Sequence, residues 1–184
     1  MRIISGKYKG RRLSASDNLS IRPTTDRVKE YIFSIIAEYL DKSRVYDLFS
    51  GSGNLGIEAL SRGATHVTFI DKNPASIQTL KKNLQLLDIT DNQYVIVMKD
   101  ALRFAIDNAG DGHFYFLDPP FVYPDLQQLV DLLVKNVARE HAVFVIEHEI
   151  SNPISQQHAD YEMLRQKKIG RSLISFIKKV QNNE

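Results

Sequence analysis

In the stretch Asp47-Leu-Phe-Ser-Gly-Ser-Gly-Asn-Leu-Gly56, three glycines follow an apolar run and lead into a helical pattern. Residues 45–49 predict a strand, and residues 55–62 predict a helix that ends at Gly63. Glycines let the backbone approach a ligand closely, and a helix N-terminus presents free N–H groups. Asp71 ends the next expected strand, where its carboxylate can accept both hydroxyls of a ribose. The pattern therefore indicates a nucleoside-bearing cofactor, and NAD(P) stays open because the spacing also matches GxGxxG.

Short apolar runs alternate with helical periodicity along the middle of the chain. This alternation predicts βαβ units, and hence an α/β fold whose mostly parallel sheet is covered by helices on both faces. Two more strands around Gly170-Arg171 are expected to form an antiparallel hairpin at one edge, for seven strands altogether. The expected strands cover residues 45–49, 66–71, 94–99, 114–117, 142–147 and two segments within 161–180.

Helices are expected at five places. The first follows Pro23, where Thr24, Thr25 and Asp26 are N-cap candidates. Its expected apolar stripe is Val28, Ile32, Ile35, Ile36 and Tyr39. The others are expected over 55–62, from Pro74 onward, over about 101–108 and around 126–133. Residues 1–13 predict a small hairpin, so we divide the chain into a basic hairpin extension over 1–22 and one domain over 23–184.

The composition excludes several classes of protein. Of the 184 residues, 43% are hydrophobic and 25% are charged, which is ordinary for a folded domain and unlike a disordered chain. The absence of cysteine excludes a disulfide framework and a thiolate metal site, and it fits a reducing cytoplasm. No apolar run is long enough to span a membrane. We therefore expect a cytoplasmic protein, and a monomer because no apolar helix face is left over.

No metal site is expected. The five histidines include no close pair with ligand spacing, and Glu147-His148-Glu149 is expected at a solvated strand end with His148 on the opposite face from the acids.

The net charge of +2 hides an uneven distribution. Residues 1–30 carry eight basic and three acidic side chains, and residues 161–180 carry six basic and one acidic, so the rest of the chain is acidic. If the two basic segments meet in space, they predict contact with a polyanion.

Asp118-Pro-Pro-Phe121 follows the fourth expected strand, at the edge where open α/β sheets bind ligands. The two prolines fix the backbone and remove two N–H donors. This leaves a ledge of backbone that can only accept hydrogen bonds, through its carbonyl oxygens. The Asp118 carboxylate and a carbonyl of the proline region can accept hydrogen bonds from an exocyclic amine, and Phe121 can stack on the base that carries it. The motif predicts a clamp for an extruded base.

Together these motifs resemble class I S-adenosylmethionine-dependent methyltransferases that modify exocyclic amines. The sequence further resembles the RsmD family over nearly its whole length. The resemblance is carried by Met1-Arg-Ile-Ile-Ser-Gly-Lys-Tyr-Lys-Gly-Arg-Arg-Leu13, Arg22-Pro-Thr-Thr-Asp-Arg-Val28, Asp47-Leu-Phe-Ser-Gly-Ser-Gly53 and Glu58-Ala-Leu-Ser-Arg-Gly-Ala64. It implies a Rossmann-like methyltransferase fold, S-adenosylmethionine as cofactor, and methylation of the N2 amine of one guanine in bacterial 16S rRNA, either naked or in the assembling 30S subunit.

The resemblance also implies a role for each motif residue. The methionine end of the cofactor is assigned to Asp47, Gly51, Gly53 and Asn54, the ribose to Asp71, and the adenine amine to Asp100. The target guanine is assigned to Asp118, Pro119, Pro120 and Phe121. Arg22, Thr24, Asp26 and Arg27 are expected near the catalytic face. The expected RNA contacts are Lys7, Lys9, Arg11, Arg12, Arg22 and Arg27.

Three alternatives remain at this point. A DNA amino-methyltransferase would share the site, although such enzymes usually carry a target-recognition domain for which this chain has no room. An NAD(P)-dependent oxidoreductase would share the glycine turn but leave residues 118–121 unexplained. A non-catalytic RNA-binding module would explain the charge but not the acids expected around a cofactor.

Overall fold

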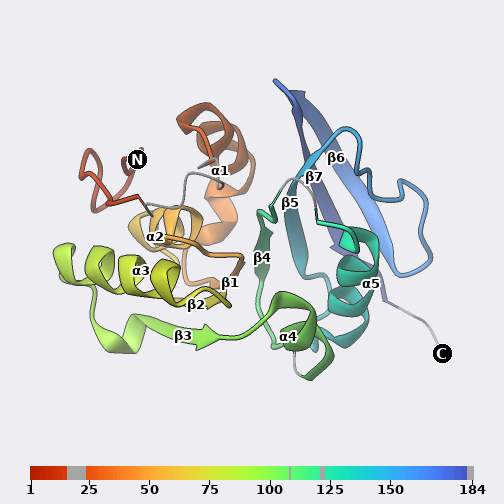
Figure 1. Cartoon of the computed structure of the whole chain (residues 1–184). Coiled ribbons are helices and arrows are strands. Elements are labelled where there is room, and N and C mark those ends of the chain that lie inside the picture. Colours follow the sequence, from red (N-terminus) through yellow and green to blue (C-terminus); the bar gives the residue numbers. More distant parts are fainter. Residues whose placement is uncertain (16–23, 108, 121–122, 182–184) are drawn as a thin grey trace.

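A seven-stranded sheet organises the computed structural model, which describes residues 1–15, 24–107, 109–120 and 123–181. The strand order is β3-β2-β1-β4-β5-β7-β6 (Figure 1). Strands β1 to β5 pair in parallel, whereas β7 is antiparallel to both β5 and β6, which confirms the predicted fold class. The strands are β1 (Arg44–Leu48), β2 (His66–Asp71), β3 (Tyr94–Met98), β4 (Phe114–Leu117), β5 (Val143–Glu149), β6 (Tyr161–Ile169) and β7 (Ser172–Lys179).

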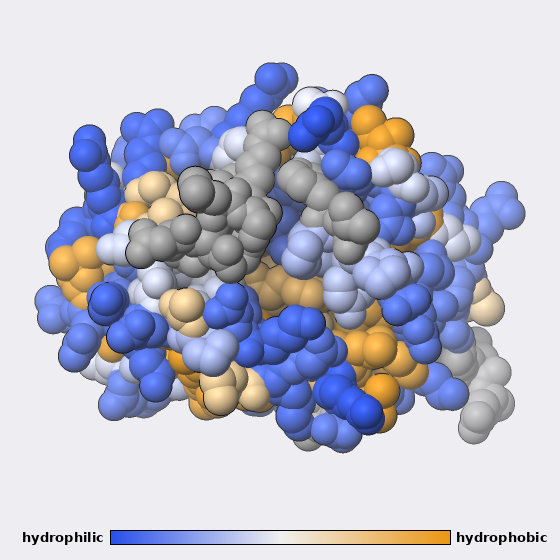
Figure 2. Space-filling model, in the orientation of Figure 1, coloured by the Kyte–Doolittle hydropathy of each residue, from blue (hydrophilic) through white to orange (hydrophobic). Residues whose placement is uncertain are grey.

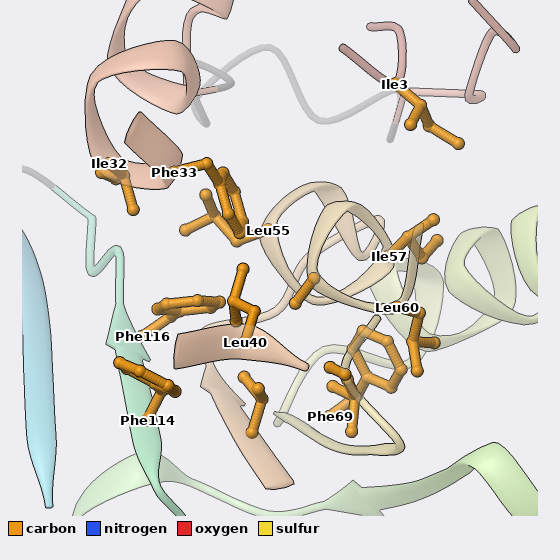
Figure 3. Packing of buried hydrophobic residues seen from close by; sticks show 14 of the residues in the cluster. Ile3, Ile32, Phe33, Leu40, Leu55, Ile57, Leu60, Phe69, Phe114 and Phe116 are labelled. Carbon is orange, nitrogen blue, oxygen red and sulfur yellow. The ribbon is translucent and has the colours of Figure 1, made fainter. Parts of the chain in front are cut away.

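Five α-helices cover the two faces of the sheet (Figure 1). Residues of β4 alternate between two apolar cores, as expected for a strand buried on both sides: Phe116 packs in the first core and Leu117 in the second. Helices α1 to α3 complete the first core (Figure 3), and α4 and α5 complete the second. The helices are α1 (Asp26–Leu40), α2 (Asn54–Ser61), α3 (Pro74–Leu86), α4 (Ala101–Asp107) and α5 (Leu126–Asn136), with a short 3-10 helix at Asp91–Gln93.

The apolar stripe predicted for α1 is wrong at Tyr39. That side chain is 68% exposed, and Leu40 is buried in its place. The buried row of α1 runs through residues 28, 32, 36 and 40 at a spacing of four, with Phe33 beside it, and residue 39 falls outside this row. The predicted stripe also omits Phe33, which is fully buried.

The solvated strand end predicted around His148 is also wrong. His148 is buried, and its Nε2 lies 2.9 Å from Ser175 Oγ while its Nδ1 lies 2.9 Å from the Asn152 carbonyl oxygen. Burial lowers the pKa of this imidazole. The reason is that β7 pairs with β5 over the whole length of β5, as far as Glu149, so the strand end is covered.

The basic N-terminal segment folds back on itself and docks on α2. One antiparallel bridge joins Arg2 to Arg12, and Ile3 N donates to the Arg11 carbonyl at 2.9 Å. Gly6, at φ +85°, lies so close to α2 that an added Cβ would stand 1.7 Å from the Ser61 carbonyl oxygen. Ile3, Tyr8 and Leu13 belong to the first core. The predicted boundary at residue 22 lies outside the described residues.

Glu58 of α2 joins this segment to two helices. Its fully buried carboxylate accepts hydrogen bonds from Ile4 N at 2.8 Å and Ser5 N at 3.1 Å. It also accepts from Lys29 Nζ of α1 at 3.2 Å and from Arg62 Nε at 2.8 Å. Lys29 is 1% exposed, and its burial lowers its pKa despite the facing carboxylate.

The outer surface is mostly hydrophilic, with exposed apolar residues in small separate groups on the face that Figure 2 shows. In the described part of the chain, no helix is both long and apolar enough to cross a membrane.

We expect Glu58→Ala to destabilise the protein by about 3–5 kcal/mol, because it removes the opposite charge from the buried Lys29 ammonium group and the acceptor from two backbone N–H groups. The free energy of unfolding in urea measures this. Asp107→Ala is the control: it removes the 2.9 Å ion pair with Lys99, whose side chains are both exposed, and should cost less than about 1 kcal/mol. Equal losses in the two variants would show that Glu58 has no special structural role.

Candidate active site

A cavity of about 620 Å³ opens at the carboxyl ends of the parallel strands. This is the edge where open α/β sheets bind ligands, because the loops after adjacent strands diverge there. Residues at or near the end of every strand from β1 to β5 line it, together with residues at the start of α1 and in the β6–β7 turn. Its wall includes Arg27, Phe49, Gly51, Asp71, Lys72, Lys99, Asp100, Asp118, Pro119, Pro120, Tyr123, Glu147, Gly170 and Arg171.

The glycine turn after β1 has two separate functions. Gly51 lines the cavity at φ +53°, and an added Cβ there would meet only the Phe49 carbonyl oxygen, at 3.9 Å. Gly53 precedes α2 at φ +88°, and an added Cβ would stand 2.5 Å from Leu80 Cδ1. Gly51 therefore leaves a backbone wall open to a ligand, and Gly53 lets α2 and α3 pack together.

Three of the predicted cofactor residues lie behind this wall and are not among the lining residues: Asp47, Gly53 and Asn54. Asp47 is 2% exposed, and its Oδ2 accepts a hydrogen bond from Gly56 N at 2.9 Å. Burial raises the pKa of Asp47 to about 7, with a further contribution from the charge of Asp71. Asn54 Nδ2 donates to the Thr24 carbonyl oxygen at 3.2 Å and so ties the start of α2 to the segment before α1.

Asp71 and Asp100 are held at the cavity by backbone N–H groups. Asp71 Oδ2 accepts from Gly51 N and its Oδ1 from Asn73 N, both at 2.8 Å. Asp100 Oδ1 accepts from Leu102 N at 3.0 Å, at the start of α4, and its Oδ2 accepts from Lys72 Nζ at 3.1 Å. Burial acts to raise the pKa of Asp100, but the hydrogen bonds from Lys72 and the α4 amides outweigh it and the pKa is lowered. Asp100 is therefore ionised at neutral pH.

Asp118 has a different environment. Thr24 Oγ1 donates to its Oδ2 at 2.5 Å. Removal of water by the surrounding protein raises the pKa of Asp118 well above its ordinary value, and the charges of Glu147 and Asp47 add to this. Pro119 is buried and Pro120 is exposed, and both line the cavity. Phe121 lies outside the described residues.

Two aromatic residues with no role predicted from the sequence also line the cavity. Phe49 and Tyr123 meet edge to face, with ring centroids 5.1 Å apart. Phe49 has φ 60°, a left-handed conformation that costs a bulky side chain energy and is often found at functional sites. No pattern in the sequence predicts this conformation.

The segment before α1 places Thr24 against the site, near the face where the family resemblance expects it. Its hydroxyl reaches Asp118, while the helix cap belongs to its neighbour Thr25, which accepts from Val28 N at 3.3 Å. Asp26 lies further out, in an ion pair with Arg2 at 2.8 Å, and is not among the lining residues.

Glu147 is a site residue that the sequence motifs do not indicate. Its predicted place at a solvated strand end is wrong, since it is only 8% exposed and lines the cavity. Its position at the end of the fifth parallel strand, on the same edge as Asp118, is the signal that could have identified it.

The two basic segments do meet. Arg27 of α1 and Arg171 of the β6–β7 turn line the same cavity. Lys167 of β6 lies over the ring of Tyr31 in α1, with Nζ 5.3 Å from the ring centroid. Lys7, Lys9, Arg11 and Arg12 are exposed on the N-terminal segment, outside the cavity wall, and Arg11 Nη2 donates to the Leu86 carbonyl at 2.8 Å. Arg22 lies outside the described residues.

Comparison with known proteins gives consistent matches. Residues 1–178 match the family model described as "Conserved hypothetical protein 95". The chain is 36% identical over 173 residues to ribosomal RNA small subunit methyltransferase D of Haemophilus influenzae, covering 92% of this chain and 89% of that protein. The solved structure of the yhhF protein of Escherichia coli superposes with a TM-score of 0.87 at 32% identity, over 99% of both chains.

A more distant structure shares the fold. The RNA methyltransferase of Salinibacter ruber, solved in complex with S-adenosyl-L-homocysteine, superposes with a TM-score of 0.68 at 16% identity, over 89% of this chain and 97% of that one.

We expect Gly53→Ala to destabilise the protein by about 2–5 kcal/mol, since the left-handed backbone and the clash with Leu80 both oppose a side chain. Gly170→Ala is the matched control: it also has positive φ, 63°, but an added Cβ meets nothing within 4 Å. That variant should cost only about 1–2 kcal/mol. Thermal and urea unfolding measure both, and a Gly53 variant no worse than the control would contradict the packing role.

Proposed function

Because the chain belongs to the family of conserved hypothetical protein 95, the RsmD-type methyltransferases, we propose that it transfers a methyl group from S-adenosylmethionine to the N2 amine of a guanine in the 16S rRNA of the small ribosomal subunit. Such a substrate implies a cytoplasmic enzyme, and we expect it to act as a monomer. The name of the Haemophilus influenzae relative supports a small-subunit rRNA. The choice of guanine N2 rests on the resemblance of the sequence motifs to those of the family.

One observation carries the proposal: a single cavity holds both a nucleoside-type site and an acceptor-rich ledge. Gly51, Asp71 and Asp100 line it from the ends of β1, β2 and β3, and Asp118, Pro119 and Pro120 line it from the end of β4, the neighbour of β1 on the other side. An NAD(P) site would need the first group but not the second, and a non-catalytic RNA-binding module would need neither.

The residues on the wall fit the cofactor. Backbone N–H groups fix the carboxylates of Asp71 and Asp100 at the cavity, where Asp71 would accept from the ribose hydroxyls and the ionised Asp100 from the adenine amine. The open backbone at Gly51 leaves room for the methionine portion, with Asp47 and Asn54 supporting the turn from behind. When bound, the cofactor supplies an already activated methyl group on a cationic sulfur.

Catalysis by the protein then consists mainly of positioning. The lone pair of a guanine N2 is delocalised into the ring, so the amine is a weak nucleophile. Hydrogen bonds from the amine to Asp118 and to a carbonyl of the proline ledge hold it in place and expose its lone pair, and such alignment can supply most of the rate. The carboxylate of Asp118 also stabilises the positive charge that develops on nitrogen.

Arg27 and Arg171 stand at the cavity beside this ledge, where they can bind phosphates on either side of an extruded nucleotide. The exposed bases Lys7, Lys9, Arg11 and Arg12 would extend this interaction along the RNA.

The test is transfer of labelled methyl from S-adenosylmethionine to 30S subunits that lack the modification, with naked 16S rRNA and duplex DNA alongside. Label on the N2 of one guanine in 16S rRNA is the expected result. Label on DNA alone would assign the enzyme to the DNA amino-methyltransferases. Absence of label, with no cofactor binding by calorimetry, would contradict the proposal as a whole.

We expect Asp118→Ala to lower the methylation rate by at least about 100-fold, because the variant has neither the hydrogen-bond acceptor for the amine nor the stabilising charge. Cofactor and 30S binding should be nearly unchanged. Calorimetry and filter binding check this, and methylation that survives the substitution would remove Asp118 from the proposed mechanism.

We expect the double variant Arg27→Ala/Arg171→Ala to bind 30S subunits more weakly. The plot of the logarithm of the association constant against log[salt] should become less steep by about 2, because each arginine is proposed to neutralise one phosphate. Lys42→Ala/Lys135→Ala is a charge-matched control, since both lysines are exposed and lie away from the cavity wall. An unchanged slope in the arginine variant would show that these side chains do not bind phosphates.

A further inference from the structure

The ladder between β4 and β5 ends in two carboxyl groups. Its last pair is Leu117 with Ile146, and the next residues along the two parallel strands are Asp118 and Glu147. Adjacent strands lie about 4.8 Å apart, and residues in register point to the same face. Both side chains line the cavity. Two acids are thus neighbours in the proposed substrate site.

Glu147 is a buried acid beside a second acid. It is 8% exposed, and its ladder partner on β7 is Ile174, which is fully buried. Buried acids that lie next to another acid in a cavity are concentrated at functional sites. The proposed contacts of the RNA and of the cofactor do not involve Glu147, so its position calls for another role.

Charged and polar groups face the pair from every neighbouring element. Thr24, before α1, donates to Asp118 Oδ2, and Asp47 of β1, whose own pKa is raised to about 7, adds negative charge when it is ionised. Arg27 of α1 and Arg171 of the β6–β7 turn are cations in the lining of the same cavity. The lining also includes Asp71, Lys72, Lys99 and Asp100, which lie at or just after the ends of β2 and β3. His148 lies next along β5, and its ring is engaged with Ser175 and Asn152.

We propose that Glu147 is a positioning residue that acts through Asp118, and that its negative charge makes Asp118 the acceptor of the proton that the target amine releases on methylation. The inference rests on the proposed function. In the step, the amine nitrogen forms a bond to the methyl carbon and the electron pair of the broken S–C bond stays on sulfur. The nitrogen, now cationic, passes its extra proton to the Asp118 carboxylate.

This role predicts the direction of the pH dependence. The pKa of Asp118 is raised by burial and by Glu147, so Asp118 is protonated at low pH and cannot take up a proton. The rate should therefore rise with pH until Asp118 ionises. Removing the charge of Glu147 lowers the pKa of Asp118 and shifts this acidic limb to lower pH.

The experiment measures single-turnover methylation of 30S subunits from pH 5.5 to 9 in wild type and Glu147→Gln. We expect the acidic limb to shift down by about one pH unit, so that the rate relative to each plateau rises about tenfold at pH values below the wild-type limb. Glu149→Gln is the matched control: it removes the same charge two residues along β5 but lies outside the cavity wall. Its limb should not move.

Asp118→Asn tests the route of the effect. An amide oxygen can still accept from the amine but does not titrate, so residual activity should have no acidic limb. Adding Glu147→Gln to Asp118→Asn should then change nothing further, because the charge acts through residue 118. If adding Glu147→Gln still changes the pH profile of the Asp118→Asn variant, the inference is overturned.

Two outcomes separate the inference from the proposed function. Methylation of 30S subunits with an acidic limb that Glu147→Gln leaves in place would overturn the role of Glu147 alone. No methylation by wild type would overturn the proposed function. Carboxyl ¹³C NMR of the wild-type protein needs neither substrate nor a folded variant, and an Asp118 that titrates in the ordinary aspartate range would also overturn the inference.

Discussion

The buried carboxylate of Glu58 holds together the part of the molecule that encloses the active site. It joins the N-terminal segment, α1 and α2 through four hydrogen bonds. A buried ion pair is rarely the most stabilising choice for such a position, since a packed apolar pair would avoid the desolvation of both charges. Its advantage here is directional. A carboxylate with four fixed donors allows few alternative arrangements, and so it fixes where α1 begins.

The start of α1 matters because three interactions of the site depend on it. Thr24 reaches Asp118, the Thr24 carbonyl accepts from Asn54, and Arg27 stands at the cavity. The sheet supplies the other half of the site. Because β1 to β5 are parallel, residues from 51 to 147 in the chain meet at one edge. The site is therefore built from the sheet edge and from the start of α1. The hydrogen bonds of Glu58 hold the start of α1 in position next to the sheet edge.

Most of the fold could be predicted from the sequence, because each element carries its own local pattern. All seven strands and five helices lie where apolar runs and periodicity indicate, within one or two residues at most ends. The motif residues Gly51, Asp71, Asp100 and Asp118 are recognisable because each follows a strand. Glu147 and Arg171 are not, since their place in the site depends on which strands are neighbours and on how the β6–β7 turn folds over the cavity. His148 is mispredicted for a related reason: the cover over β5 comes from β7, which lies more than twenty residues further along the chain.

The pKa values of two cavity acids are shifted in opposite directions: that of Asp100 is lowered and that of Asp118 is raised. Asp100 is kept ionised by Lys72 and by backbone N–H groups, in the way a carboxylate is held when it must accept hydrogen bonds permanently. Within the described part of the chain, the hydrogen bond to Asp118 comes from a hydroxyl group, and burial together with the charge of the neighbouring Glu147 raises the pKa of Asp118 well above its ordinary value. A cofactor site needs fixed charge, because its ligand does not change its hydrogen bonding during the reaction. An amine that becomes a cation needs a neighbour whose charge can change with it. The same sheet edge provides an acid of each kind. Because Asp100 and Asp118 have the same side chain, the difference between their pKa values comes from their surroundings.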